Sequence, residues 1–475
     1  MSIIASYMVP HPPMIVPQIG RGSEERVRKT IDAYNQVADE IAGIKPDTII
    51  ISSPHSIMYA DYFHISPGKS AFGNFSGFGV PEVKFHETYD WELVERICLL
   101  ANESGLAAGT LGERDASLDH GTMVPLYFIR QKYNDFNIIR IGLSGQSLYK
   151  HYELGKLIKQ AISDLDRRAV YVASGDLSHK LQDYGPYGYA PEGPTYDERI
   201  MKVCSSGEFD KLFDFDEEFC DKAAECGHRS FVMMAGALDG NRVIAKELSH
   251  EDVTGVGYGI CTFSVETDSA GAPVYDPERE FLRKHLNQKK SELTERYKDS
   301  DEYVRLALKS LESYILNHRK LSVSEGVSGF SDEAKTELLN KQAGAFVSIH
   351  EHGRLRGCIG TILPTCENVA QEIINNAISA STRDPRFEPI ESDELPFLEV
   401  NVDVLGEPEP IDSMDELDPK RYGVIVSKGR RRGLLLPDLD GVDTVEQQVS
   451  IARQKAGIDE FEDVSLERFE VVRHI

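Results

Sequence analysis

The stretch DTIIISSPHS, residues 47–56, joins a short run of apolar, β-branched residues to a proline and a histidine. A run of this kind, bounded by Ser and Pro, predicts a buried strand that ends just before His55. The pattern recurs in SIIASYMVPHPP (2–13), which contains His11, and in AVYVASGDLSH (169–179), which ends on His179. NIIRIGLS (137–144) and GYGICTFSVE (257–266) are further predicted strands.

Helical stretches lie between these strands, for example EERVRKTIDAYNQVADEIAGI (24–44) and LGKLIKQAISDL (154–165). Alternation of strands and amphipathic helices indicates a sheet that is largely parallel. We therefore predict an α/β domain over residues 1–266, with a mixed, mainly parallel sheet flanked by helices.

A second domain is predicted after a break at TDSAGAPV (267–274), with residues 267–299 as a linking, partly helical region. DEYVRLALKSLESYIL (301–316) has helical spacing, whereas FLEVNVDVL (397–405) alternates apolar and polar residues like a half-buried strand. YGVIVSKGRRRGLLLP (422–437) predicts a hairpin around Lys428-Gly429. Residues 300–475 are thus expected to form an α+β domain.

Composition excludes several classes of protein. The 475 residues include 52 Lys+Arg and 78 Asp+Glu, a net charge of −26, which disfavours nucleic acid and anionic membranes as partners. No apolar run approaches the ~18 residues of a membrane span, and the N-terminus lacks the features of a secretory signal. The seven scattered cysteines fit reduced thiols, so a cytoplasmic location is expected.

Four histidines stand out by position. His11, His55 and His179 follow predicted strands, and His120 lies in the loop motif LDHGTMVPL (118–126). In open α/β sheets ligands bind at the carboxyl ends of the strands, so these side chains are expected to converge. A single histidine at such a place is usually structural, but Pro and Gly flank these four. Two imidazoles with a carboxylate leave open positions on Fe(II), and a further histidine can act as a base.

The motifs VPHPP, SPHS, LDHGTMVPL and SGDLSH, in this order, make the first domain similar to the class III extradiol (LigB-type) dioxygenases, including their Memo-like branch. The resemblance implies that His11 and His55 bind Fe(II). It implies that His179 is the general base, with Asp176 and Ser178 orienting it, and that His120 assists as an acid or hydrogen-bond donor. The expected substrates are a small aromatic diol and O₂.

The third metal ligand is sought in AAECGHRSFVMMAGALDG (223–240). Glu225 is the expected ligand, and it favours redox iron. The Memo-like branch has Cys-Gly at this point, so Cys226 is the alternative, and a thiolate favours Zn or Cu(I). His228 can also complete a site, and Glu225 can instead do no more than cap the following helix.

The second domain holds two motifs, GRLRGCIGTILP (353–364) and STRDPRFEPI (381–390). Arg356 near Cys358 can lower the pKa of a thiol, but a small buried cysteine in a strand is the favoured interpretation. Arg383, Asp384 and Arg386 can bind an anion or close a salt-bridged turn. These motifs, with the strand and hairpin above, resemble the AMMECR1 domain family.

The two resemblances together lead to one main hypothesis and two rivals. The first domain is expected to be an Fe(II)-dependent extradiol dioxygenase, fused to an AMMECR1 domain of unknown activity. Fusion of these two parts resembles the AmmeMemoRadiSam system, which implies a radical-SAM partner protein; the CxxxCxxC run of that partner is absent here. The rivals are a Memo-like metal-binding or redox protein without oxygenase activity, and a Zn-dependent hydrolase.

Overall fold

The computed structural model describes residues 2–298, 300–351, 353–392, 394–439 and 441–475, with Arg296 described by its backbone alone. The chain forms two compact units, Met1–His285 and Leu286–Ile475. The predicted fold class, an α/β domain followed by an α+β domain, is confirmed.

The N-terminal unit alternates helices and strands. Its strands are β1 (Ile3–Val9), β2 (Thr48–Ser53), β3 (Phe63–His64), β4 (Ser70–Phe75), β5 (Val80–Thr88), β6 (Ala108–Gly109), β7 (Asn137–Gly142), β8 (Ala169–Ser174), β9 (Val243–Glu251) and β10 (Tyr258–Val265). Its helices are α1 (Pro17–Gly20), α2 (Arg28–Ile44), α3 (Trp91–Ser104), α4 (His120–Ile129), α5 (Leu148–Asp164), α6 (Glu192–Ser206), α7 (Glu217–Ala223) and α8 (His228–Ala237). Helix α9 (Phe281–Lys298) begins in this unit and ends in the next.

The main sheet has the strand order β7-β2-β8-β1-β10-β9. Strands β7, β2, β8 and β1 are parallel, whereas β10 and β9 join in antiparallel pairing. The carboxyl ends of β2, β8 and β1 therefore lie next to one another on the same edge. This edge is where the predicted histidine segments begin.

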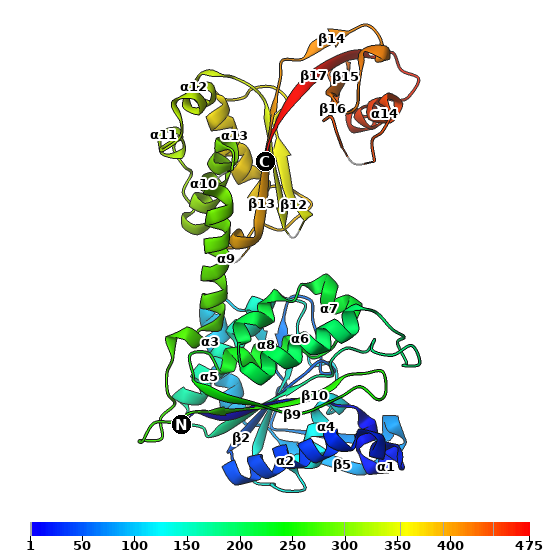
Figure 1. The fold of residues 1–475 in the computed structure, drawn as a ribbon, viewed down its shortest axis with the longest axis vertical. Helices are drawn as coiled ribbons and strands as arrows, with labels where there is room; N and C mark the ends of the chain where they lie inside the picture. The colour runs from blue at the N-terminus through cyan, green and yellow to red at the C-terminus, as the bar shows by residue number, and fades with distance from the viewer. Residues whose placement is uncertain (1, 299, 352, 393, 440) are drawn as a thin grey trace. The chain divides into compact units, whose positions relative to one another are not determined.

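Helices cover both faces of this sheet (Figure 1). On one face, Tyr7 and Val9 of β1 share a core with Tyr34 of α2 and Phe128 of α4. On the other face α5 and α8 pack closely at Gly236, where there is no room for a side chain. A Cβ added at this position would lie 2.0 Å from the carbonyl oxygen of Tyr152. The two helix layers hold the sheet edge in place.

The C-terminal unit is built on a curled antiparallel sheet. Its strands are β11 (Ala345–Glu351), β12 (Arg354–Gly360), β13 (Leu398–Leu405), β14 (Glu409–Ile411), β15 (Tyr422–Lys428), β16 (Arg431–Leu435) and β17 (Ser465–His474), in the order β12-β11-β13-β17-β15-β16 with β14 beside β17. Its helices are α10 (Glu302–Asn317), α11 (Val323–Gly326), α12 (Asp332–Asn340), α13 (Val369–Thr382) and α14 (Val445–Ala456).

Strand β13 shows why this unit folds as it does. Leu398, Val400, Val402 and Val404 are all buried in a core that also contains residues of α10 and α13. These two helices pack against the sheet (Figure 1). On its other face Asp403 is also buried, because Arg473 of the neighbouring strand donates to its carboxylate from Nε at 2.8 Å. The predicted alternation is present, and one of its polar positions is buried through an ion pair.

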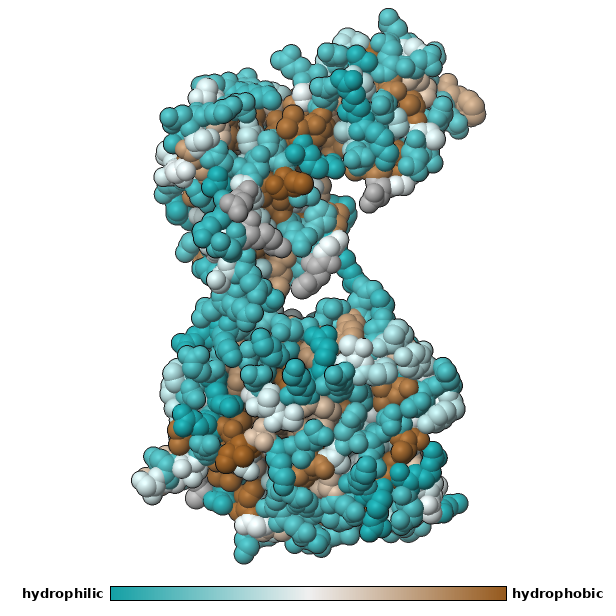
Figure 2. Space-filling view, in the orientation of Figure 1, coloured by the Kyte–Doolittle hydropathy of each residue, from teal (hydrophilic) through white to brown (hydrophobic). Residues whose placement is uncertain are grey.

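Surface hydropathy fits an acidic, well-packed chain. On the face shown in Figure 2, hydrophilic side chains predominate and hydrophobic ones form small separate patches. In the described part of the chain, every helix is too short or too polar to cross a bilayer.

Candidate metal centre

The predicted histidines meet at the carboxyl edge of the main sheet. His11 follows β1, His55 follows β2, and His179 lies in the segment that follows β8. His120 is the first residue of α4, which Asp119 caps. Segments more than 160 residues apart in the chain are thus brought to one place, because β2, β8 and β1 are neighbours in the sheet.

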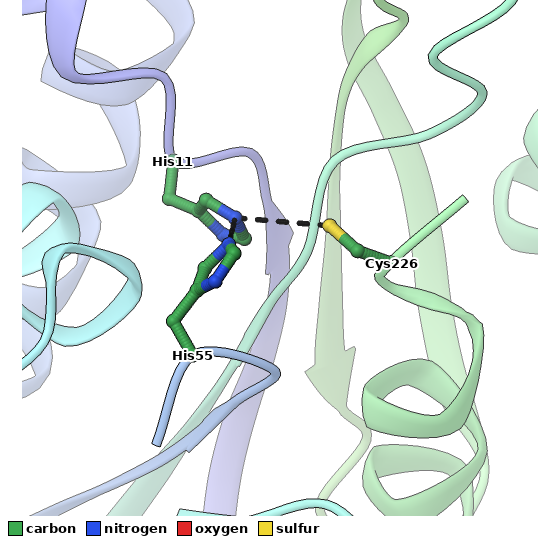
Figure 3. Close-up of side chains that lie close together, drawn as sticks. All are labelled: His11, His55 and Cys226. Atoms are coloured by element: carbon green, nitrogen blue, oxygen red, sulfur yellow. Dashed lines mark hydrogen bonds between the residues drawn. The ribbon is translucent and has the colours of Figure 1, made fainter. Parts of the chain in front are cut away.

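Two of these imidazoles and one thiol form a group of donor atoms. Nε2 of His11 lies 3.0 Å from Nε2 of His55, and the Cys226 Sγ lies 3.7 Å from His11 Nε2. All three donor atoms lie within 4.8 Å of one another, and the side chains point toward a common centre (Figure 3).

Donor spacing tests whether these residues fit one metal ion. With bonds of about 2.0–2.1 Å to nitrogen and about 2.3 Å to sulfur, a tetrahedral ion separates two nitrogens by roughly 3.3 Å and a nitrogen from a sulfur by roughly 3.6 Å. The separations of 3.0 and 3.7 Å are close to these values. Two of the three donor separations therefore fit a single ion, and the third, between His55 and Cys226, is within 4.8 Å.

The other two imidazoles lie beside this group. The His120 ring is 4.0 Å from the His55 ring and 5.4 Å from the His11 ring, between centroids. His179 stacks on Tyr187 with centroids 5.0 Å apart. Burial lowers the pKa of both His120 and His179 to about 4, so both rings are neutral at pH 7. Burial, followed by the neighbouring imidazoles, also lowers the pKa of His11.

Glu225, the expected third ligand, is not part of this group. Its carboxylate instead accepts a hydrogen bond of 2.6 Å from the backbone N–H of His228, at the first turn of α8. Burial raises the pKa of Glu225 to about 7. The side chain that faces His11 and His55 is that of Cys226, the alternative. The His228 ring does not face His11 and His55 either. Its nitrogens make hydrogen bonds with the Leu212 carbonyl and the Tyr196 hydroxyl.

The residues that flank His179 hold its segment. Asp176 accepts the backbone N–H of His11 at 2.7 Å, and burial raises the pKa of this carboxyl to about 7. The hydroxyl of Ser178 donates to the Ala223 carbonyl, which also accepts the backbone N–H of His179. Both predicted orienting residues therefore fix the backbone around the site.

Sequence reasoning missed two residues that position these histidines. The Asp119 carboxylate accepts the hydroxyl of Ser53 at 2.6 Å and caps α4 through the N–H of Thr122 at 3.0 Å. Ser53 Oγ in turn accepts the backbone N–H of His55 at 3.2 Å. Asp directly before a helical run is an N-cap signal, so the role of Asp119 at α4 was readable from the sequence. Its contact with Ser53 was not.

The second-domain residues form a salt-bridged turn. Asp384 accepts the backbone N–H of Cys358 at 2.9 Å and the Arg386 guanidinium at 2.7 Å. Arg356 does not face the thiol, because its guanidinium binds Glu394 at 2.6 Å. Arg383 ends α13. Two roles were predicted for the RDPRF motif, binding an anion or closing a salt-bridged turn, and the geometry corresponds to the turn.

Comparison with known proteins connects this geometry to a family. Residues 5–261, more than half of the chain, match the family described as the catalytic LigB subunit of aromatic ring-opening dioxygenase. The chain belongs to the LigB family. This LigB-family protein also carries an AMMECR1 domain, because residues 304–474 match the AMMECR1 family. The predicted combination of the two is confirmed.

Relatives differ in how much of the chain they match. A protein of Clostridium acetobutylicum is 40% identical over 484 residues, covering 100% of this chain and 99% of its own. A protein of Thermotoga maritima is 52% identical over 174 residues, covering 36% of this chain and 96% of its own. A 2-aminophenol 1,6-dioxygenase beta subunit of a Pseudomonas species is 26% identical over 296 residues, covering 55% of this chain and 94% of its own.

Proposed function

We propose that the LigB domain is an Fe(II)-dependent enzyme that opens the ring of a small aromatic compound with two adjacent oxygen or nitrogen substituents, using O₂. The observation that carries this proposal is the convergence of His11, His55 and Cys226 within 4.8 Å of one another, with further imidazoles beside them. The relative that is a 2-aminophenol dioxygenase subunit supports this class of substrate.

The metal would be held by His11, His55 and Cys226. Fe(II) with few protein ligands supplies positions at which a substrate and O₂ meet. Burial raises the pKa of the Cys226 thiol well above its usual value, so the thiol is protonated at pH 7 and would lose its proton on binding a cation. Both His11 and His55 have lowered pKa values, mainly through burial, and this keeps their lone pairs free for a cation.

The other two histidines supply proton transfer. Since His179 is neutral at pH 7, its free ring nitrogen can accept the proton of a substrate hydroxyl. The neutral His120 ring carries one N–H, with which it can donate a hydrogen bond to a developing negative charge on oxygen. Each role needs only a neutral imidazole at the site.

Two exposed aromatic rings support an aromatic substrate. Tyr187, 59% exposed, stacks on His179, and Phe78, 41% exposed, packs edge-on against His120 with centroids 5.5 Å apart. Rings that stay exposed beside a site offer stacking area to a planar ligand.

Oxygen uptake tests the proposal. The full chain is purified without oxygen, loaded with one equivalent of Fe(II), and mixed with catechol or 2-aminophenol in the presence of O₂. The proposal expects substrate-dependent O₂ uptake and a ring-opened product, with a rate about 10²–10⁴-fold lower for His179→Gln. A His86→Gln variant, changed outside the four-histidine cluster, is the control. Equal rates with and without Fe(II) would rule the proposal out.

Cys226 favours a second candidate. A thiolate in place of a carboxylate selects softer ions such as Cu(I) or Zn. We propose as the alternative a Memo-like metal-binding or redox protein that uses the same residues without oxygenase chemistry. Competition between Fe(II), Zn²⁺ and Cu(I) for the full chain separates the two. Preference for Cu(I) or Zn²⁺ with no O₂ uptake on any diol supports the alternative, and preference for Fe(II) with O₂ uptake rejects it.

A further inference from the structure

The Ser174 hydroxyl links two parts of the site. Ser174, the last residue of β8, is fully buried. Its Oγ lies 2.6 Å from the backbone carbonyl of Gly121 and 2.9 Å from Nδ1 of His11. One hydroxyl therefore contacts both the first turn of α4 and the imidazole that faces the metal group.

Counting protons assigns the direction of each bond. A carbonyl oxygen can only accept, so the single proton of the Ser174 hydroxyl goes to Gly121. Ser174 then has only lone pairs to offer His11, and Nδ1 of His11 must carry the proton between them. A neutral imidazole has one N–H, which leaves Nε2 as an unprotonated nitrogen with a free lone pair.

We propose that Ser174 is a positioning residue that holds His11 in its Nδ1–H tautomer and so presents the Nε2 lone pair to a metal ion. The partner of the second ring nitrogen sets which nitrogen is available to a metal, and it also raises ligand basicity. The same assignment makes His11 Nε2 the acceptor in its 3.0 Å contact with His55. The metal part of this inference rests on the proposed function, but the tautomer does not.

The position of the Gly121 carbonyl is itself fixed. The Asp119 carboxylate caps the helix at this point and accepts the Ser53 hydroxyl. Gly121 packs so close to Ser53 that an added Cβ would lie 2.3 Å from its Oγ. The Gly121 carbonyl, which accepts the Ser174 proton, is therefore held in place. The histidine segments after β1 and β2 are thus connected by hydrogen bonds to the helix that begins with His120.

Nitrogen-15 NMR of histidine-labelled full chain, kept free of metal, tests the tautomer. The His11 signals are assigned by their loss in His11→Gln. We expect a protonated Nδ1 and an unprotonated Nε2 in the wild type. A His11 with the proton on Nε2 would overturn the inference, whether or not the protein binds a metal.

Zn²⁺ titration of full-length variants tests the consequence. Ser174→Ala is expected to bind Zn²⁺ about 10–100-fold more weakly than the wild type. The matched control is Ser52→Ala, a fully buried serine on the neighbouring strand β2 whose hydroxyl contacts Ser230 at 2.6 Å; its affinity is expected to stay at the wild-type value.

The outcomes separate the claims. Unchanged affinity in Ser174→Ala, or equal losses in both variants, overturns the positioning role. If Ser174→Ala does not fold, the wild-type NMR signal still decides the tautomer. If the wild type binds no Zn²⁺, Fe(II) or Cu(I), the proposed metal site fails, while the tautomer assignment stands or falls on the NMR result alone.

Discussion

Replacing Asp119 with alanine tests how the histidine segments are held. The carboxylate accepts three hydrogen bonds: from the Ser53 hydroxyl at 2.6 Å, from the Thr122 N–H at 3.0 Å and from the Thr122 hydroxyl at 2.9 Å. Loss of an N-cap costs about 1 kcal/mol. The Ser53 and Thr122 hydroxyls are fully buried, and each left without an acceptor costs about 1–3 kcal/mol.

The expected loss of unfolding free energy is therefore about 3–7 kcal/mol for Asp119→Ala. Asp119→Asn is expected to lose less, about 1–2 kcal/mol, because asparagine caps helices as well as aspartate does and keeps one acceptor oxygen. Trp91, the chain's only tryptophan, begins α3 in the same unit, so its fluorescence during urea unfolding follows the N-terminal unit alone.

Asp115→Ala is the matched control. Asp115 also accepts hydrogen bonds from a nearby serine, Ser117, but it lies on an exposed loop. Its loss is expected to stay within about 0.5 kcal/mol, as for most surface substitutions. If Asp119→Ala costs no more than the Asp115 control, the carboxylate does not hold these segments, and the reasoning about the buried hydroxyls is wrong.

Three further predictions concern other parts of the chain. The hydrogen bond from Arg386 lowers the pKa of Asp384, so the stability that Asp384 adds is full above about pH 5 and is lost as the pH falls through its folded pKa. Urea unfolding followed by circular dichroism should therefore show that Asp384→Ala is less stable than the wild type at pH 7. The difference in stability between the two proteins should begin to close below about pH 4. Gly236→Ala is expected to lower the stability by at least 1–3 kcal/mol, because its methyl group would meet a backbone carbonyl of α5 at 2.0 Å, and an unchanged midpoint of Trp fluorescence would contradict this packing. Tyr187→Leu is expected to raise KM for an aromatic diol several-fold while metal content is kept, whereas Tyr184→Leu, 72% exposed in the wild type, should leave KM unchanged.

Much of the fold could be predicted from local pattern. The runs that became β1, β2, β7, β8 and β10 were short, apolar and bounded by turn residues, and buried strands require this pattern. The hairpin of β4 with β5 and the edge strand β9 were not predicted. Both are largely exposed and carry polar residues, so their periodicity is weak, and pairing with a neighbour stabilises them.

The site was only partly readable. Histidines after strands pointed to one sheet edge because parallel strands end together, and this argument needs no contacts. The choice between Glu225 and Cys226 depended on which of these adjacent side chains points toward His11 and His55. The two residues lie in a turn before a helix, and a turn has no regular periodicity that predicts side-chain direction. Ser174 was out of reach for a similar reason, since its partners lie 53 and 163 residues away.

The central claim is that His11, His55 and Cys226 together hold one metal ion. X-ray absorption at the metal edge, on full chain with measured metal content, tests this most directly. We predict one ion per chain, bound by imidazole nitrogens and by one sulfur at about 2.3 Å. The sulfur signal should be lost in Cys226→Ser. A chain that takes up no ion, or an ion bound by nitrogen and oxygen alone in both proteins, would contradict it.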